Sequence, residues 1–225
     1  MRNAMLLWYA KSETEEIPLT FILEVIGTIA FAFAGALVAI DNDLDLFGIE
    51  CMAVMTACGG GMTRDIILGN TPPMMFRNPV YVTMAVATGF LTVIIYHKFI
   101  QSLYKDKILD MVSILDAIGL AIFTIVGMDL AMQLGFSGAF LICAMGVLTA
   151  VGGGLLRDVM VNVKPVILTK EVYATASMIG SVFYYFMLQT AVPAIVTTVI
   201  ALVIIFGLRM WTIIKHINLP VVEKK

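Results

Sequence analysis

The stretch ACGGGMTRDIILGNTPP at residues 57–73 places three consecutive glycines, an arginine and an aspartate inside an otherwise apolar run. A closely similar stretch, AVGGGLLRDVMVNVKP, occupies residues 150–165. The shared pattern is GGGxxRD, and its first glycine recurs 93 positions later, at Gly59 and again at Gly152. A charged pattern that is repeated within apolar sequence indicates two copies of one structural unit.

The composition of the chain is that of a membrane protein. Hydrophobic residues make up 60% of its 225 residues and charged residues only 13%, whereas soluble domains are about half apolar and about a quarter charged. Mean hydropathy is +0.98. The charges gather between long apolar runs, and no basic cluster indicates a nucleic-acid partner. We therefore predict an all-α protein that lies among membrane lipids and crosses the membrane several times.

Seven apolar runs are long enough to cross the bilayer, which takes roughly 20 residues of helix. They lie at about residues 18–40, 46–68, 79–97, 111–133, 138–161, 172–190 and 192–214. We therefore predict seven transmembrane helices. The remaining parts are an N-terminal segment at 1–17, a polar linker at 98–110 and a tail at 215–225.

The duplication extends well beyond the glycines. Glu24 in the first span corresponds to Asp116 in the fourth, 92 positions later, and VYVTMA from Val80 corresponds to VYATAS from Val172. Each unit contains three spans, and because three is odd, the two copies must cross the membrane in opposite directions. This inverted-repeat architecture is typical of transport proteins. The two units and the additional seventh span lie at 18–97, 111–190 and 191–214.

The two glycine triplets have two interpretations. Each glycine weakens a helix by about 1 kcal/mol relative to alanine, which predicts a break in the second and fifth helices, with freed backbone groups along a water-filled cavity. The carbonyl end of such a break suits a cation, and its N–H end suits an anion. The alternative is close helix packing; the neighbouring charges and the duplication favour the break. The glycines are Gly59, Gly60, Gly61, Gly152, Gly153 and Gly154.

Charges at membrane depth are costly and mostly functional. The duplicated pairs are Arg64–Asp65 and Arg157–Asp158. Neighbouring side chains on a helix point about 100° apart, so we predict that each arginine bonds to another helix. Its partner would be Glu24 or Asp116, which are also candidate cation sites, or a carbonyl at the opposite break.

Other polar residues in the spans are weaker candidates. Hydroxyls of threonine can line a pore, although on helices they commonly bond to their own backbone. Arg209, in the seventh span, is expected to reach toward the membrane interface. The threonines in question are Thr56, Thr63 and Thr149.

Lysine and arginine are distributed unequally between the two sides of the predicted topology. Ten lie on the side of the 98–110 linker and the C-terminus, and four lie on the side of the N-terminus. Positive charge collects on the cytoplasmic side of membrane proteins. The N-terminus is therefore predicted outside, and the C-terminus in the cytoplasm.

The doubled GGGxxRD within two three-span units, followed by a seventh span, resembles the TRIC family of trimeric intracellular cation channels. It is most similar to their prokaryotic homologues and to a related bacterial group described as glycine transporters. The resemblance implies a homotrimer in which every protomer has its own pore, framed by the broken second and fifth helices. It also implies passage of potassium and, less selectively, sodium, here across the plasma membrane of a prokaryote.

These observations favour a monovalent-cation channel over other classes. No phosphate-binding GK[ST] follows the glycines, and no nucleophile–base pair or metal-binding cluster is evident in the sequence. The chain is therefore not expected to be an enzyme or to need a cofactor. The alternative is a secondary transporter for a small amino acid such as glycine, because inverted repeats with broken helices suit a carrier equally well.

Overall fold

The computed structural model describes residues 19–100, 105–169 and 172–215. The predicted segment 1–17 and residues 216–225 of the predicted tail lie outside this range. The long helices are α2 (Leu19–Asp41), α3 (Leu46–Ile67), α5 (Val80–Ile95), α6 (Lys105–Gln133), α7 (Ala139–Met160), α9 (Val172–Met187) and α10 (Ala194–Lys215). Between them lie two short helices, α4 (Met74–Arg77) and α8 (Val166–Thr169), and a π-helical turn, η1 (Tyr96–Ile100).

Six helices in the described part of the chain are long and apolar enough to cross a membrane, namely α2, α3, α5 continued by η1, α6, α7 and α10. The prediction of an all-helical, multi-pass membrane protein is therefore confirmed. The sixth predicted span, 172–190, corresponds to α9, which has only 16 residues. The count of seven spans stays a prediction.

Local sequence explains where several helices begin. α5 and α10 start directly after Pro79 and Pro193, where the missing N–H of proline costs little. α3 starts after Asp45, whose carboxylate accepts a hydrogen bond from the Gly48 N–H at 2.7 Å. This contact satisfies one of the N–H groups that have no partner within the helix.

The fourth predicted span begins earlier than its apolar run. α6 starts at Lys105 and not near residue 111, because its first turns bury Ile108 and Val112 in a cluster with Leu37 of α2 and Ile100 of η1. The predicted linker 98–110 is therefore helical at both ends, and its residues 101–104 lie outside the described range.

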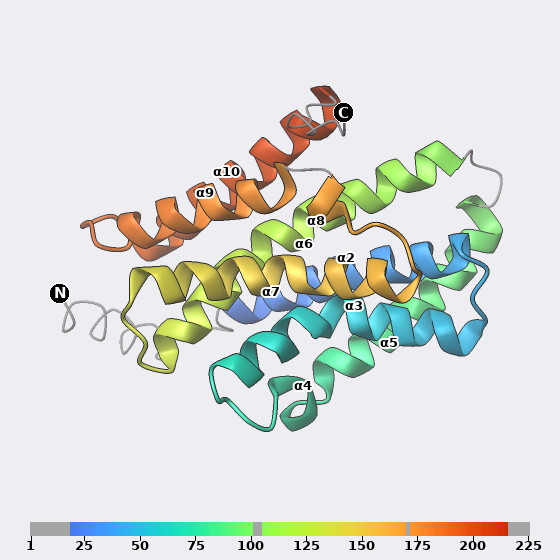
Figure 1. The fold of residues 1–225 in the computed structure, drawn as a ribbon, viewed down its shortest axis with the longest axis horizontal. Helices are drawn as coiled ribbons and strands as arrows, with labels where there is room; N and C mark the ends of the chain where they lie inside the picture. Colours follow the sequence, from blue (N-terminus) through green and yellow to red (C-terminus); the bar gives the residue numbers. More distant parts are fainter. Residues whose placement is uncertain (1–18, 101–104, 170–171, 216–225) are drawn as a thin grey trace, which may run out of the picture.

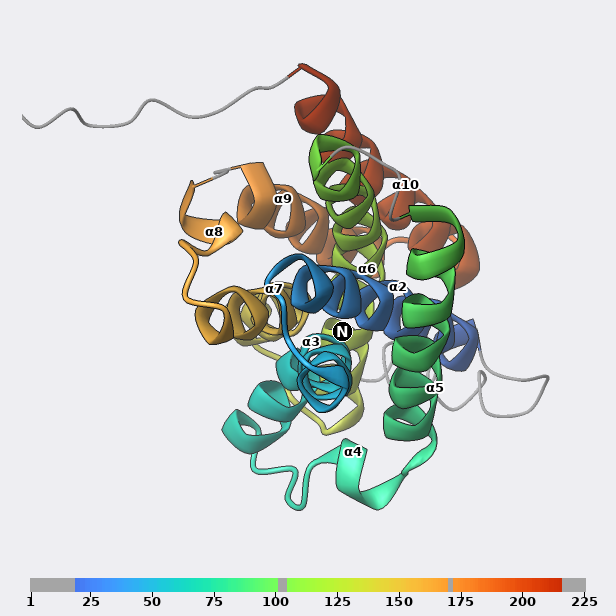
Figure 2. The ribbon, with the colours of Figure 1, turned by 90° about the vertical axis from the view of Figure 1, so that its right-hand side faces the viewer.

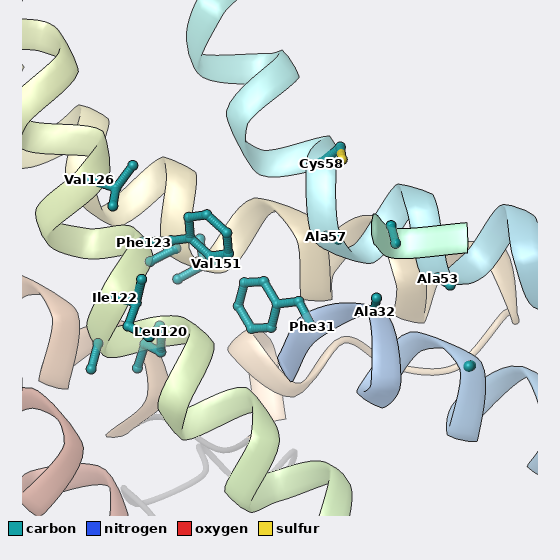
Figure 3. Packing of buried hydrophobic residues seen from close by; sticks show 14 of the residues in the cluster. Phe31, Ala32, Ala53, Ala57, Cys58, Leu120, Ile122, Phe123, Val126 and Val151 are labelled. Atoms are coloured by element: carbon teal, nitrogen blue, oxygen red, sulfur yellow. The ribbon is translucent and has the colours of Figure 1, made fainter. Parts of the chain in front are cut away.

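The core lies where α2, α3, α6 and α7 meet (Figures 1 and 2). The candidate spans in α6 and α2 are 72% and 56% buried, against 22% for α5 with η1, which lies on the outside of the bundle. Phe31 of α2 stacks on Phe123 of α6, with ring centroids 5.3 Å apart (Figure 3). Such offset aromatic pairs add attraction to simple burial, and this pair joins the first helix of each predicted repeat.

The predicted break at the glycines is wrong. α3 runs without interruption from Leu46 to Ile67, and α7 from Ala139 to Met160, through both glycine triplets. A break inside a membrane would leave several backbone groups in need of new partners, each costing several kcal/mol. The loss of helix propensity is only about 1 kcal/mol per glycine, so continuous hydrogen bonding prevails.

The glycines instead allow α3 and α7 to touch backbone to backbone. A Cβ atom on Gly60 would overlap the carbonyl oxygen of Thr149, and one on Gly153 would overlap that of Thr56. A Cβ on Gly152 would lie only 2.9 Å from the Cα of Gly60. Close packing, the alternative interpretation, is therefore what these glycines provide.

Candidate functional site

One group of polar residues, here called the Glu24 cluster, comprises Glu24, Arg64, Asp65 and Tyr81 at the end of α3. Nε and Nη2 of Arg64 donate to Oδ1 of Asp65 at 3.0 and 2.9 Å. The Tyr81 hydroxyl on α5 donates to the Glu24 carboxylate on α2. Arg64 and Asp65 are buried. The cluster thus combines a buried ion pair, Arg64 with Asp65, with the half-buried carboxylate of Glu24.

A second group, the Asp116 cluster, comprises Asp116, Arg157 and Asp158 at the end of α7. Nη1 and Nη2 of Arg157 donate to the two carboxylate oxygens of Asp116 on α6, at 2.8 and 2.9 Å. Nε of Arg157 donates to Asp158 at 2.9 Å. Bidentate pairing of this kind is among the strongest hydrogen-bond arrangements in proteins, so this cluster fixes α7 to α6.

The prediction that each arginine bonds to another helix is confirmed for Arg157 and wrong for Arg64. Among the described residues, Arg64 donates to its sequence neighbour Asp65. Cβ atoms of neighbours diverge on a helix, but the arginine side chain is long enough to fold back beside the aspartate. Glu24, the expected partner, accepts from Tyr81 instead.

Both aspartates also hold a short helix that the sequence reasoning missed. Oδ2 of Asp65 accepts the Met74 N–H at the start of α4, and Oδ2 of Asp158 accepts the Val166 N–H at the start of α8, both at 2.8 Å. A carboxylate satisfies free N–H groups at a helix start. Each short helix could have been predicted from the proline directly before it, Pro73 in the first repeat and Pro165 in the second.

A cavity of about 50 Å³ opens beside the Glu24 cluster, with room for a few water molecules. All four residues of the cluster line it. It extends between the helices to Phe123 and Val126 of α6 and to Thr149 of α7. Because Thr149 also touches Gly60, the cavity leads from the buried charges to the crossing of α3 and α7.

The three candidate threonines already use their hydroxyl hydrogens. Thr56, Thr63 and Thr149 each donate to the carbonyl oxygen four residues earlier on the same helix. A hydroxyl that donates a hydrogen bond can still accept one through the lone pairs of its oxygen. Of the three threonines, Thr149 lines the cavity. Their role as pore oxygens stays a prediction.

The expectation for Arg209 is wrong, because its side chain is buried and does not reach toward the interface. It is 3% exposed, and its guanidinium carbon lies 4.9 Å from the ring centroid of Tyr173 on α9. A cation at this distance over an aromatic face is attracted to the ring. Neither the Arg209 Nε nor the Tyr173 hydroxyl has a hydrogen-bond partner among the described residues.

Sequence comparison identifies close relatives among bacterial membrane proteins. A family model described as glycine transporter matches this chain twice, at residues 21–97 and 113–189. The UPF0126 inner membrane protein YadS of Escherichia coli is 34% identical over 90% of this chain and 95% of its own length. A UPF0126 membrane protein of Vibrio cholerae is 33% identical over 93% of this chain and 85% of its own length.

Solved structures share the same fold. The TRIC trimeric intracellular cation channel orthologue from Rhodobacter sphaeroides is 30% identical, with a TM-score of 0.81 over 88% of this chain and 99% of that protein. Another TRIC cation channel is 32% identical, with a TM-score of 0.80 over 92% of this chain and 98% of that protein. The chain therefore belongs to the glycine-transporter (UPF0126) family, and its structure places it among the TRIC-type membrane proteins.

Proposed function

We propose that the protein is a passive channel for monovalent cations, chiefly potassium and less selectively sodium, in the plasma membrane of a prokaryote. The observation that carries this proposal is the charge balance of the cavity. The carboxylates of Glu24 and Asp65 line it together with one guanidinium, that of Arg64. The cavity wall therefore has one negative charge in excess, and such a cleft concentrates cations.

The proposed ion path follows α3 and α7. It starts at the cavity beside the Glu24 cluster, reaches Thr149, and continues toward the Asp116 cluster alongside the closely packed crossing of α3 and α7 and not through it. Backbone carbonyls and hydroxyls can replace part of the hydration shell of a potassium ion, and Thr149, which lines the cavity, has both kinds of oxygen. The similarity of the fold to TRIC cation channels supports the path.

We further propose seven membrane-spanning helices in two inverted repeats, with α10 as the unpaired seventh. The double match of one family model supports this arrangement, as do the matching contacts of Asp65 with Met74 and of Asp158 with Val166. A homotrimer with one pore per protomer is proposed by analogy with the trimeric orthologue. Light scattering should give three times the 24.5 kDa chain mass; the mass of a single chain would contradict the trimer.

Recording from the purified protein in planar bilayers tests the channel directly. Unitary currents are expected, with potassium passing more readily than sodium. Glu24→Gln removes the excess carboxylate charge of the cavity and should lower the potassium conductance by about threefold to tenfold. Asp110→Asn, which changes an exposed acid on α6, is the control and should leave the conductance unchanged. Wild-type protein without unitary cation currents would refute the proposal.

A second candidate function is secondary transport of glycine, which the description of the matching family model favours. The Glu24 cluster offers carboxylates for an ammonium group and the Arg64 guanidinium for a carboxylate. Proteoliposomes separate the two functions. Saturable glycine uptake without unitary currents would favour the carrier, whereas potassium flux that glycine does not alter would favour the channel.

The proposed orientation has the N-terminus outside and the C-terminus in the cytoplasm, as the charge distribution indicates. Two single-cysteine variants test it in a background without the native cysteines. A membrane-impermeant thiol reagent should modify Ser12→Cys on intact cells, and Val222→Cys only after the cells are permeabilised. The reverse labelling pattern would exclude this orientation.

A further inference from the structure

The two charged clusters lie toward opposite ends of the molecule, since α3 and α7, which end in them, run in opposite directions in Figure 1. Each cluster contains two acids and one arginine, so each has one negative charge in excess. At the Asp116 cluster an additional cation, Arg209, enters from the seventh helix.

Tyr173 connects Arg209 to the Asp116 cluster. Its ring faces the Arg209 guanidinium carbon at 4.9 Å. Its hydroxyl and Nη2 of Arg157 lie 3.3 and 3.8 Å from the position that a Cβ atom on Gly154 would occupy. Arg209 is also within electrostatic range of Asp116. These side chains are buried, and buried charges are screened by salt much less than exposed ones.

The equivalent tyrosines of the two repeats have different environments. Tyr81 donates its hydrogen bond to Glu24, and no arginine of the described residues forms an ion pair with that carboxylate. Among the described residues, the Tyr173 hydroxyl has no acceptor, and both carboxylate oxygens of Asp116 accept from Arg157. The face of the Tyr173 ring is instead occupied by the guanidinium of Arg209.

We propose that Arg209 is a built-in counter-ion that neutralises the Asp116 cluster and thereby determines where mobile cations are held. The inference rests on the proposed channel function. Cations accumulate at the Glu24 cluster and not at the Asp116 cluster, although the two clusters have the same acids-to-arginine ratio. The charge along the path is therefore uneven, and a path with uneven fixed charge passes unequal currents in its two directions.

Single-channel currents in symmetric potassium chloride, at equal positive and negative voltages, test this role. The wild-type channel should pass unequal currents. Arg209→Gln should bring the two currents close to equality and raise the conductance by about threefold to tenfold, because the second cluster gains a net negative charge. Arg209→Met serves where the glutamine variant does not assemble, since an unbranched apolar side chain needs no hydrogen-bond partner when buried.

Three further variants separate the charge of Arg209 from a structural role. Arg209→Lys keeps the charge and should keep the wild-type current ratio. Lys215→Gln, at the exposed end of the same helix, should also leave the ratio unchanged. Glu24→Gln removes the excess charge at the other end, so it should also even out the currents but lower the conductance.

Two outcomes would overturn the inference, and they are distinguishable. Neutral Arg209 variants that assemble and conduct with the wild-type current ratio would refute the role of Arg209 while leaving the channel intact. A wild-type protein that passes no cation current would refute the proposed function, and the inference with it.

Discussion

Gly60→Ala and Gly153→Ala should each lower the melting temperature of the detergent-solubilised protein by about 5–10 °C. A single methyl group at Gly60 would overlap the Thr149 carbonyl, and one at Gly153 would overlap the Thr56 carbonyl. Backbone atoms of a packed helix cannot rotate away as a side chain can, so α3 and α7 would have to separate. Thermal unfolding followed by loss of the monodisperse chromatographic peak measures the effect.

Two control variants make the same chemical change where space is available. Among the described residues, a Cβ atom on Gly207 of α10 would meet no atom within 4 Å, and one on Gly61 would meet the Arg64 guanidinium, with Nη2 at 3.5 Å and Cζ at 3.9 Å. Gly207→Ala should be neutral or slightly stabilising, because alanine is the better helix former. Gly61→Ala should cost little. If Gly60→Ala and Gly61→Ala lowered the melting temperature equally, close packing would not explain the glycine at position 60.

The apolar runs allowed the long helices to be predicted from the sequence, because length, hydropathy and the prolines at helix starts act locally. The glycine triplets led to the wrong prediction of a helix break, because helix propensity is measured in water. There, freed backbone N–H and C=O groups form hydrogen bonds to water. Between packed helices in a membrane they do not, so α3 stays continuous through Gly59, Gly60 and Gly61. Which backbone lies opposite a glycine depends on helix packing, and the sequence does not contain it locally.

The charged residues were found from the repeat, but their partners were not. The alignment treats Glu24 and Asp116 as equivalent, yet glutamate is one methylene longer, and the two carboxylates have different donors, Tyr81 and Arg157. The environment of Arg209 was predicted wrongly because α10 has no counterpart in the sequence duplication. A comparison of repeats can identify only what both copies contain, and an element that breaks the symmetry has to be seen in the structure.

Because the two arginines have different partners, their replacement by alanine should lower the stability of the protein by different amounts. Arg157→Ala should destabilise the protein by about 3–5 kcal/mol, because it leaves Asp116 as a buried carboxylate without its bidentate partner. Arg64→Ala should cost only about 1–2 kcal/mol. Asp65 would keep the Met74 N–H as donor, and Glu24 would keep Tyr81. Urea or guanidinium unfolding in detergent micelles compares the two variants.

A double variant identifies the origin of the larger loss. Arg157→Met/Asp116→Leu replaces the buried pair by apolar side chains and should recover part of the stability that Arg157→Ala loses, since breaking a buried pair costs more than removing both partners. The recovery will be incomplete, because Asp158 also loses a donor and, among the described residues, keeps the Val166 N–H alone. Equal losses for Arg64→Ala and Arg157→Ala would mean that the two clusters are energetically equivalent. The two clusters would then contribute equally to the free energy of unfolding, although their hydrogen bonds differ.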